Sequence, residues 1–93
     1  MSLKGLKIVV IDDTPSIRTF LRHSLEYEGA EFHEAGTAKD GLQLCEKILP
    51  DLVILDLGLP DENGLEVLPK IKRTQDGNKP LVLVLTVRKG HRV

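Results

Sequence analysis

Three apolar runs of the sequence each end in side chains that can take part in chemistry. They are Asp12 and Asp13 after residues 6–11, Asp56 after residues 52–55, and Thr86 after residues 81–85. Carboxylates held a few ångströms apart repel one another, so they either retain a proton at a raised pKa or surround a hard cation. Mg²⁺ suits such a cluster because it prefers oxygen ligands, keeps some of its waters and can bridge to a phosphoryl oxygen.

Phosphoryl transfer is the chemistry that this combination favours. A carboxylate that faces a phosphoryl donor beside a bound cation can act as the nucleophile and form an acyl phosphate. The cation neutralises the charge that develops on the transferred group, and positioning supplies most of the rest. The hydroxyl of Thr86, or backbone amides near it, can donate to the new phosphoryl oxygen.

Each of these residues also has a simpler explanation. An acidic pair after a buried strand is often a solvated loop that caps the next helix. Thr86 alone fits the preference of threonine for strands. Asp56 is harder to dismiss, because a carboxylate at the end of a buried strand needs a partner. The combination, more than any single residue, favours a functional site.

The elements that position these residues alternate between short apolar runs and helical periods, which is typical of a parallel sheet covered by helices. Residues 6–11 and 52–55 are almost entirely apolar, as in central strands buried on both faces. Residues 30–35 carry more charge and fit a sheet edge. Right-handed crossovers then make the first and third strands neighbours, so Asp12, Asp13 and Asp56 converge at the edge where such sheets bind ligands.

The first two helices have recognisable boundaries. Thr14 can cap the first helix, Pro15 suits its first position, and Gly29 fits a left-handed residue after its end. Thr37 with Asp40 resembles a capping box for the second helix. One face of that helix is apolar and should be buried; its members are Ala38, Leu42, Cys45 and Leu49.

A third helix is expected after Asn63 and Gly64. Its apolar positions are Leu65, Leu68 and Ile71. Pro69 lies inside this pattern and should kink or shorten the helix.

Composition limits the classes of function. The chain has 93 residues, which allow a single domain over residues 1–93. A net charge of −1 and only three aromatic residues, two Phe and one Tyr, argue against nucleic-acid binding. One cysteine excludes an internal disulfide. The sequence has neither an apolar stretch of the ~20 residues that a membrane span needs nor a signal-peptide core, so a cytoplasmic protein without membrane contact is expected.

Three segments of the sequence resemble the receiver domains of response regulators, the CheY-like family. Residues 8–15 (IVVIDDTP) resemble the opening of these domains, and residues 55–65 (LDLGLPDENGL) resemble their phosphorylation loop. Residues 84–88 (VLTVR) resemble the strand that carries their switch hydroxyl. The three segments extend over nearly the whole chain, and the spacing between them fits the family.

The resemblance implies a flavodoxin-like, doubly wound parallel sheet with strand order 2-1-3-4. It implies that Asp12, Asp13 and Asp56 bind Mg²⁺, with the backbone carbonyl of Gly58 as a further ligand. Asp56 would accept a phosphoryl group from a sensor histidine kinase in two-component signalling, and Thr86 would move toward it as a switch. A downstream protein would read the change, so the domain is expected to signal and not to act as an enzyme beyond self-catalysed phosphorylation.

The sequence departs from the family pattern in two ways. Receivers carry a Lys, usually followed by Pro, after a fifth strand, whereas this chain stops at Val93. Lys79 and Pro80 precede the fourth strand, at the opposite edge of the sheet. Val87 stands where a smaller residue is usual. We therefore expect a receiver that is incomplete at its C-terminus, without the fifth strand and last helix.

Two other functions remain open. Without the Lys, the chain would be a degenerate receiver that works only in protein interaction or dimerisation. With either function, the strand at residues 81–85 would be an apolar edge without protecting charges, so we expect a dimer or higher oligomer that covers it. A haloacid-dehalogenase-like phosphohydrolase also uses a strand-end Asp with Mg²⁺. That family needs Asp-x-Asp on its first strand, whereas Asp12 and Asp13 are adjacent.

Overall fold

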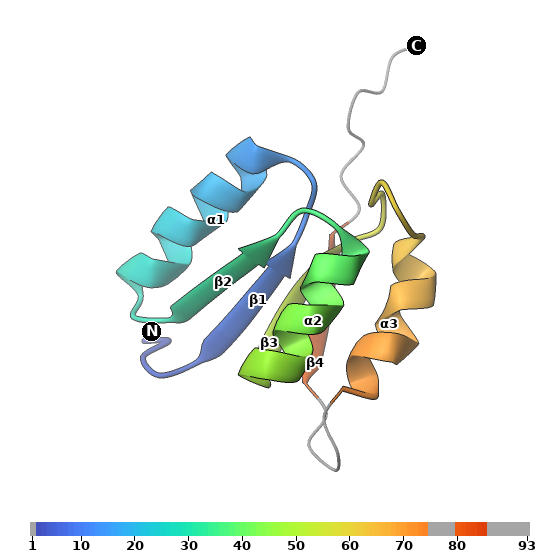
Figure 1. Ribbon diagram of the computed structural model, residues 1–93. Coiled ribbons are helices and arrows are strands. Elements are labelled where there is room, and N and C mark those ends of the chain that lie inside the picture. Colours follow the sequence, from blue (N-terminus) through green and yellow to red (C-terminus); the bar gives the residue numbers. More distant parts are fainter. Residues whose placement is uncertain (1, 75–79, 86–93) are drawn as a thin grey trace.

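Strands and helices alternate along the chain in the computed structural model, which describes residues 2–74 and 80–85 (Figure 1). The described elements are β1 Lys7–Ile11, α1 Pro15–Tyr27, β2 Glu31–Ala35, α2 Ala38–Ile48, β3 Leu52–Asp56, α3 Gly64–Lys72 and β4 Leu81–Leu85. None of these helices is both long enough and apolar enough to cross a membrane.

The described strands form one parallel sheet in the order β2-β1-β3-β4. This confirms the predicted strand order, the adjacency of the first and third strands, and the place of β2 at an edge. In the ladder between β1 and β3, Ile11 lies opposite Leu55. The two strands therefore end at the same level, and the residues that follow them lie at the same edge of the sheet.

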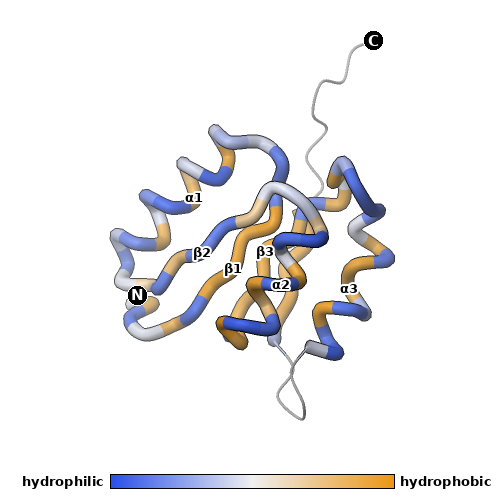
Figure 2. The backbone as a smooth tube through the Cα atoms, viewed as in Figure 1, coloured by the Kyte–Doolittle hydropathy of each residue, from blue (hydrophilic) through white to orange (hydrophobic). Residues whose placement is uncertain are grey.

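Helices cover both faces of the sheet, so the doubly wound architecture is confirmed (Figure 1). On one face, Val9 and Ile11 pack in a core with residues of α2 and α3. On the other face, Ile8 and Val10 pack with partly buried residues of α1. Figure 2 shows that β1 is hydrophobic along most of its length, while the helices alternate between hydrophobic and hydrophilic residues. The central strands are thus buried on both sides, as their composition predicts.

Most of the predicted helix boundaries are confirmed, but one predicted capping bond is not formed. Gly29 follows α1 with a φ of 95°, and the Thr37 hydroxyl accepts a hydrogen bond from the Asp40 N–H. Pro15 is the first residue of α1. Thr14 takes the N-cap position, but its side chain makes no capping hydrogen bond. The Thr14 N–H itself donates to the Asp12 carboxylate at 2.8 Å.

The buried faces of α2 and α3 differ in part from the predicted ones. Leu49 is the C-cap of α2 with a φ of 55° and is exposed, because the left-handed turn takes it off the apolar face. In α3, Leu65 is exposed and Val67 is fully buried with Ile71. Pro69 does not end the helix, which runs three residues further to Lys72. Its lost hydrogen bond would have reached the carbonyl of exposed Leu65, where water can replace it.

Cys45 is fully buried in the core beneath α2, as predicted. Burial disfavours its charged form and raises the pKa of the thiol to about 11. The described structure thus gives Cys45 a packing role, since the reactive form of cysteine is the thiolate.

Helix α2 packs against β1 through Gly41. A Cβ atom at this position would lie 2.5 Å from Cδ1 and 2.7 Å from Cγ1 of Ile11. We expect Gly41→Ala to lower the free energy of unfolding, because overpacking costs about 1–3 kcal/mol and the gain in helix propensity is only about 1 kcal/mol. Urea unfolding followed by circular dichroism measures the change. Gln43→Ala, exposed on the same helix, is the control, and equal stability of both variants would contradict the packing argument.

Asp61 joins the loop after β3 to the start of α2. Its carboxylate accepts hydrogen bonds from the N–H groups of Ala38 (2.9 Å) and Lys39 (3.1 Å), which lower the pKa of Asp61. A pKa lowered by folding stabilises the protein above the unfolded-state value, and this stabilisation is lost as the pH falls through the folded-state value. We expect Asp61→Asn to lose stability at neutral pH and to approach the unmodified chain in acid.

Urea unfolding at a series of pH values from neutral to acid tests this expectation. Glu46→Gln removes an exposed carboxylate from α2, the helix whose start Asp61 bonds, and serves as the control. A stability difference between Asp61→Asn and the unmodified chain that stays constant with pH would show that the capping bonds do not depend on the charge of Asp61.

Candidate functional site

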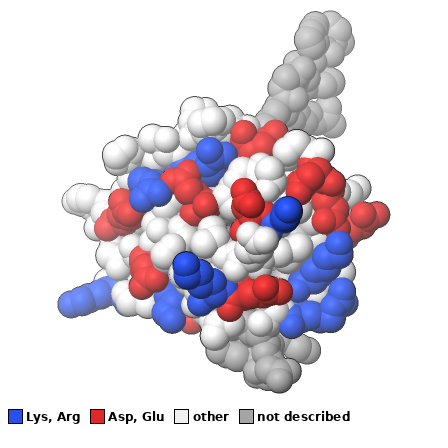
Figure 3. Space-filling view, in the orientation of Figure 1, with Lys and Arg blue, Asp and Glu red and all other residues white. Residues whose placement is uncertain are grey.

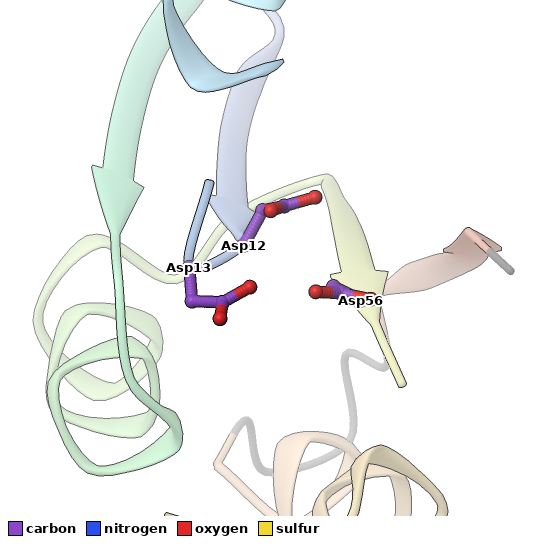
Figure 4. A group of neighbouring side chains, drawn as sticks. All are labelled: Asp12, Asp13 and Asp56. Carbon is purple, nitrogen blue, oxygen red and sulfur yellow. The ribbon is translucent and has the colours of Figure 1, made fainter. Parts of the chain in front are cut away.

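Three aspartates converge at the carboxyl edge of the sheet (Figure 4). Asp12 and Asp13 directly follow β1, and Asp56 is the last residue of β3. Each offers a carboxylate oxygen, and these oxygens all lie within 4.8 Å of one another. Asp12 and Asp56 are buried, with 1% and 2% of their surface exposed, whereas Asp13 is exposed. The structure thus brings together the three carboxylates that the sequence predicted to meet.

The turn after β1 is fixed by hydrogen bonds to Asp12. Its N–H extends the ladder to β2 by donating to the Ala35 carbonyl at 3.0 Å. Its carboxylate accepts from the Thr14 N–H at 2.8 Å, which turns the chain into α1. Its carbonyl accepts from the guanidinium of Arg18 at 2.6 Å. Backbone and side chain of Asp12 are therefore both held in place.

The loop after β3, like the turn after β1, is fixed by hydrogen bonds. The Gly58 N–H donates to the Asp56 carboxylate at 3.0 Å, and Gly58 forms a bridge with Asn63 across the loop. The Asn63 side chain caps α3 by accepting from the Leu65 N–H. Leu59, 8% exposed, anchors the loop in the core.

Gly64 brings the start of α3 against the backbone beside Asp56. A Cβ atom at this position would lie 2.6 Å from Cα of Leu57 and 2.9 Å from the carbonyl oxygen of Asp56. A side chain does not fit this gap, because the two nearest obstructing atoms belong to the main chain and cannot rotate away. Glycine therefore sets how close α3 lies to the site.

The donor set of the three aspartates fits a hard divalent cation. All of its ligand atoms are carboxylate oxygens, which Mg²⁺ and Ca²⁺ prefer. Burying two carboxylates side by side is costly without a compensating positive charge. Asp13 and Gly58 are exposed and leave one side of the cluster accessible to solvent.

The structure does not test the roles of the other predicted site residues. Thr86 and Val87 lie outside the described residues, as does Lys79. Gly58 lies beside Asp56, but its role as a carbonyl ligand stays a prediction. The sequence analysis gave no part in the site to Arg18 or Gly64, which shape it through main-chain contacts. No motif indicates the contact of Arg18. The Asn63-Gly64 pair marked the start of a helix, but not the close approach of that helix to Asp56.

Comparison with known proteins agrees with the fold. The family model of the response regulator receiver domain matches residues 8–93. The putative positive transcription regulator of virulence factors BvgA of Bordetella pertussis is 44% identical over 82 residues, which cover 86% of this chain and 38% of BvgA. An uncharacterized 14.6 kDa protein of Leptolyngbya boryana is 35% identical over 91% of this chain and 65% of its own length. The chain thus spans less than two thirds of these relatives.

Solved structures give the same result. A CheY-like response regulator receiver domain protein of Methanospirillum hungatei superposes with a TM-score of 0.77 at 33% identity, over 95% of this chain and 69% of the other. The N-terminal domain of a response regulator receiver protein of Methanoculleus marisnigri gives 0.80 at 31% identity, over 91% and 69%. With the sheet order and the acidic cluster in agreement, this chain belongs to the receiver-domain family of response regulators.

Proposed function

We propose that Asp56 accepts a phosphoryl group from a sensor histidine kinase in two-component signal transduction. One observation carries this proposal: the carboxylate oxygens of Asp12, Asp13 and Asp56 lie within 4.8 Å of one another at the end of two neighbouring strands. Two of the three residues are buried, and burying a carboxylate is costly unless partners or a cation offset its charge. Family membership supports the same conclusion.

In the proposed transfer, a carboxylate oxygen of Asp56 attacks phosphorus, and the bond from phosphorus to the histidine nitrogen of the kinase breaks. The electron pair of that bond stays on the nitrogen, and Asp56 becomes an acyl phosphate. The N–H of Gly58, which holds one oxygen of Asp56, fixes the orientation of the carboxylate. This domain is a signalling unit, and its own contribution to the chemistry is to position the acceptor.

Asp12, Asp13, Asp56 and the backbone carbonyl of Gly58 would hold Mg²⁺. When bound, Mg²⁺ would offset the negative charge of the carboxylates and of the transferred group. The hydroxyl of Thr86 would bond the new phosphoryl oxygen and pass the change to a downstream protein partner.

Phosphorylation can be tested directly. We expect the intact mass to rise by one phosphoryl group after incubation with a small-molecule phosphodonor and Mg²⁺, and the gain to vanish in Asp56→Asn. Asp51→Asn is a matched control, because Asp51 lies just before β3, at the opposite end of the strand that Asp56 ends. An unchanged mass of the folded protein with saturating Mg²⁺ would refute phosphoryl acceptance.

Cation binding can be tested separately by following amide resonances during a Mg²⁺ titration. We expect Asp12→Asn and Asp13→Asn each to weaken Mg²⁺ binding at least about tenfold, since changes to outer-shell partners alone cost about 10–100-fold. Asp51→Asn should bind like the unmodified chain. Equal affinity in all three variants would place the cation elsewhere.

A second candidate function is that of an interaction module without phosphoryl transfer. The observation that favours it is β4, where Leu81 and Leu83 are 75% and 53% exposed. Among the described strands β4 pairs only with β3, so its other edge can pair with a second copy of the chain.

Sedimentation tests this second candidate. We expect a dimer at micromolar concentration, and Leu83→Lys should shift it toward monomer because a charge on an edge opposes strand pairing. Gln43→Lys, which adds the same charge at an exposed position on α2, is the control. An unmodified chain that stays monomeric at micromolar concentrations would contradict pairing through β4.

A further inference from the structure

Arg18 joins the acidic cluster to the edge strand β2. One guanidinium nitrogen donates to the carbonyl of Asp12 at 2.6 Å, and another donates to the carboxylate of Glu34 at 2.7 Å. The side chains of Arg18 and Glu34 are only 20% and 28% exposed. The contact is thus shielded in part from solvent, and it spans from α1 to β2 past the end of β1.

We propose that Arg18 is a positioning residue for the cation site: it fixes the peptide group between Asp12 and Asp13, and Glu34 holds its guanidinium in place. This inference rests on the proposed function, because it assigns to Arg18 a part in shaping the same site.

The atom that Arg18 contacts makes this role specific. The carbonyl of Asp12 belongs to the planar peptide unit that links Asp12 to Asp13. The orientation of this unit sets where both side chains leave the main chain. The Asp12 N–H is bonded to Ala35, and its carboxylate is bonded to Thr14. The hydrogen bond from Arg18 fixes the third polar group of Asp12, its main-chain carbonyl.

Glu34 has two tasks in this arrangement. It orients the guanidinium of Arg18, and it offsets a positive charge that would otherwise oppose a cation nearby. Arg22 and Arg18 both bond Glu34 and lower the pKa of its carboxyl, Arg22 more strongly. Basic and acidic side chains alternate on the surface over α1 and β2 (Figure 3).

The room for this guanidinium depends on Gly36. A Cβ atom there would lie 3.2 Å from Nη1 of Arg18, the atom that bonds the Asp12 carbonyl. Gly36→Ala therefore displaces the guanidinium by a few tenths of an ångström while leaving its charge intact.

Arg22 provides a matched control. It bonds the same carboxylate of Glu34, and it also bonds Glu26 and lies 4.7 Å from the ring centroid of Phe32. None of its described contacts is with Asp12. Loss of Arg22 thus removes an ion pair to Glu34 from the same helix, without removing the hydrogen bond to the site.

The experiment compares Arg18→Met with Arg22→Met by two measurements on the whole chain. The first is the Mg²⁺ dissociation constant from amide resonances. We expect Arg18→Met to raise it about tenfold, the low end for loss of a residue that orients a ligand, and Arg22→Met to leave it unchanged. Arg18→Lys should recover part of the affinity, because an ammonium can donate to the carbonyl but not also to Glu34 in the same geometry.

The second measurement is hydrogen exchange of the Thr14 amide without metal, which reports how firmly the Asp12 carboxylate is held. Arg18→Met should speed this exchange and Arg22→Met should not. Urea unfolding shows whether each variant is folded. If Arg18→Met does not fold, Gly36→Ala takes its place and should change both measurements in the same direction.

The outcomes separate the inference from the proposed function. If the unmodified chain binds Mg²⁺ and both arginine variants change affinity equally, the ion pairs only support the fold and the inference is overturned. If the unmodified chain does not bind Mg²⁺, the proposed function fails, and faster Thr14 exchange in Arg18→Met alone would still support the positioning of Asp12. Equal exchange in both variants would overturn it.

Discussion

The parallel ladder between β1 and β3 is the constraint on which the site depends. It places Ile11 opposite Leu55, so the residues that follow lie at one level of the sheet edge. The two strands are almost fully buried; the buried apolar residues among them are Ile8, Val9, Val10, Ile11, Val53, Ile54 and Leu55. Each such side chain contributes about 1.5–3 kcal/mol when removed from water. A shift of one residue in this ladder would turn the side chains of one strand to the opposite face of the sheet. The packing that fixes the register therefore also fixes the position of the site.

Much of this arrangement could be predicted from the sequence because it depends on patterns within single segments. Continuous apolar runs identified the central strands, charge identified the edge strand β2, and the positions of the aspartates at strand ends located the site. Gly29 and Thr37 were also readable, since turn and cap geometry depends on the residue itself. What failed depended on the path of the backbone and on contacts that no residue type signals. Leu49 leaves the apolar face because the chain turns there, and Thr14 occupies the N-cap position without a capping hydrogen bond from its side chain. The contact of Arg18 with a main-chain carbonyl has no sequence signal, because any residue offers that carbonyl.

The relatives show this unit within longer chains. It corresponds to 38% of BvgA, a putative positive transcription regulator, and to 65% of a 14.6 kDa protein. The receiver unit is therefore found in proteins of different length.

The close approach at Gly64 has a consequence for motion. The start of α3 lies directly against the main chain of Asp56 and Leu57 because Gly64 has no side chain, and Asp61 connects the same loop to α2. Packed main-chain contacts of this kind behave as stiff linkages, because interiors compress little. On the side of β1, by contrast, the turn is connected to β2 by hydrogen bonds, from the Asp12 N–H to Ala35 and through Arg18 to Glu34. A displacement at Asp56 would therefore be carried toward α3 and α2 as a rigid-body movement.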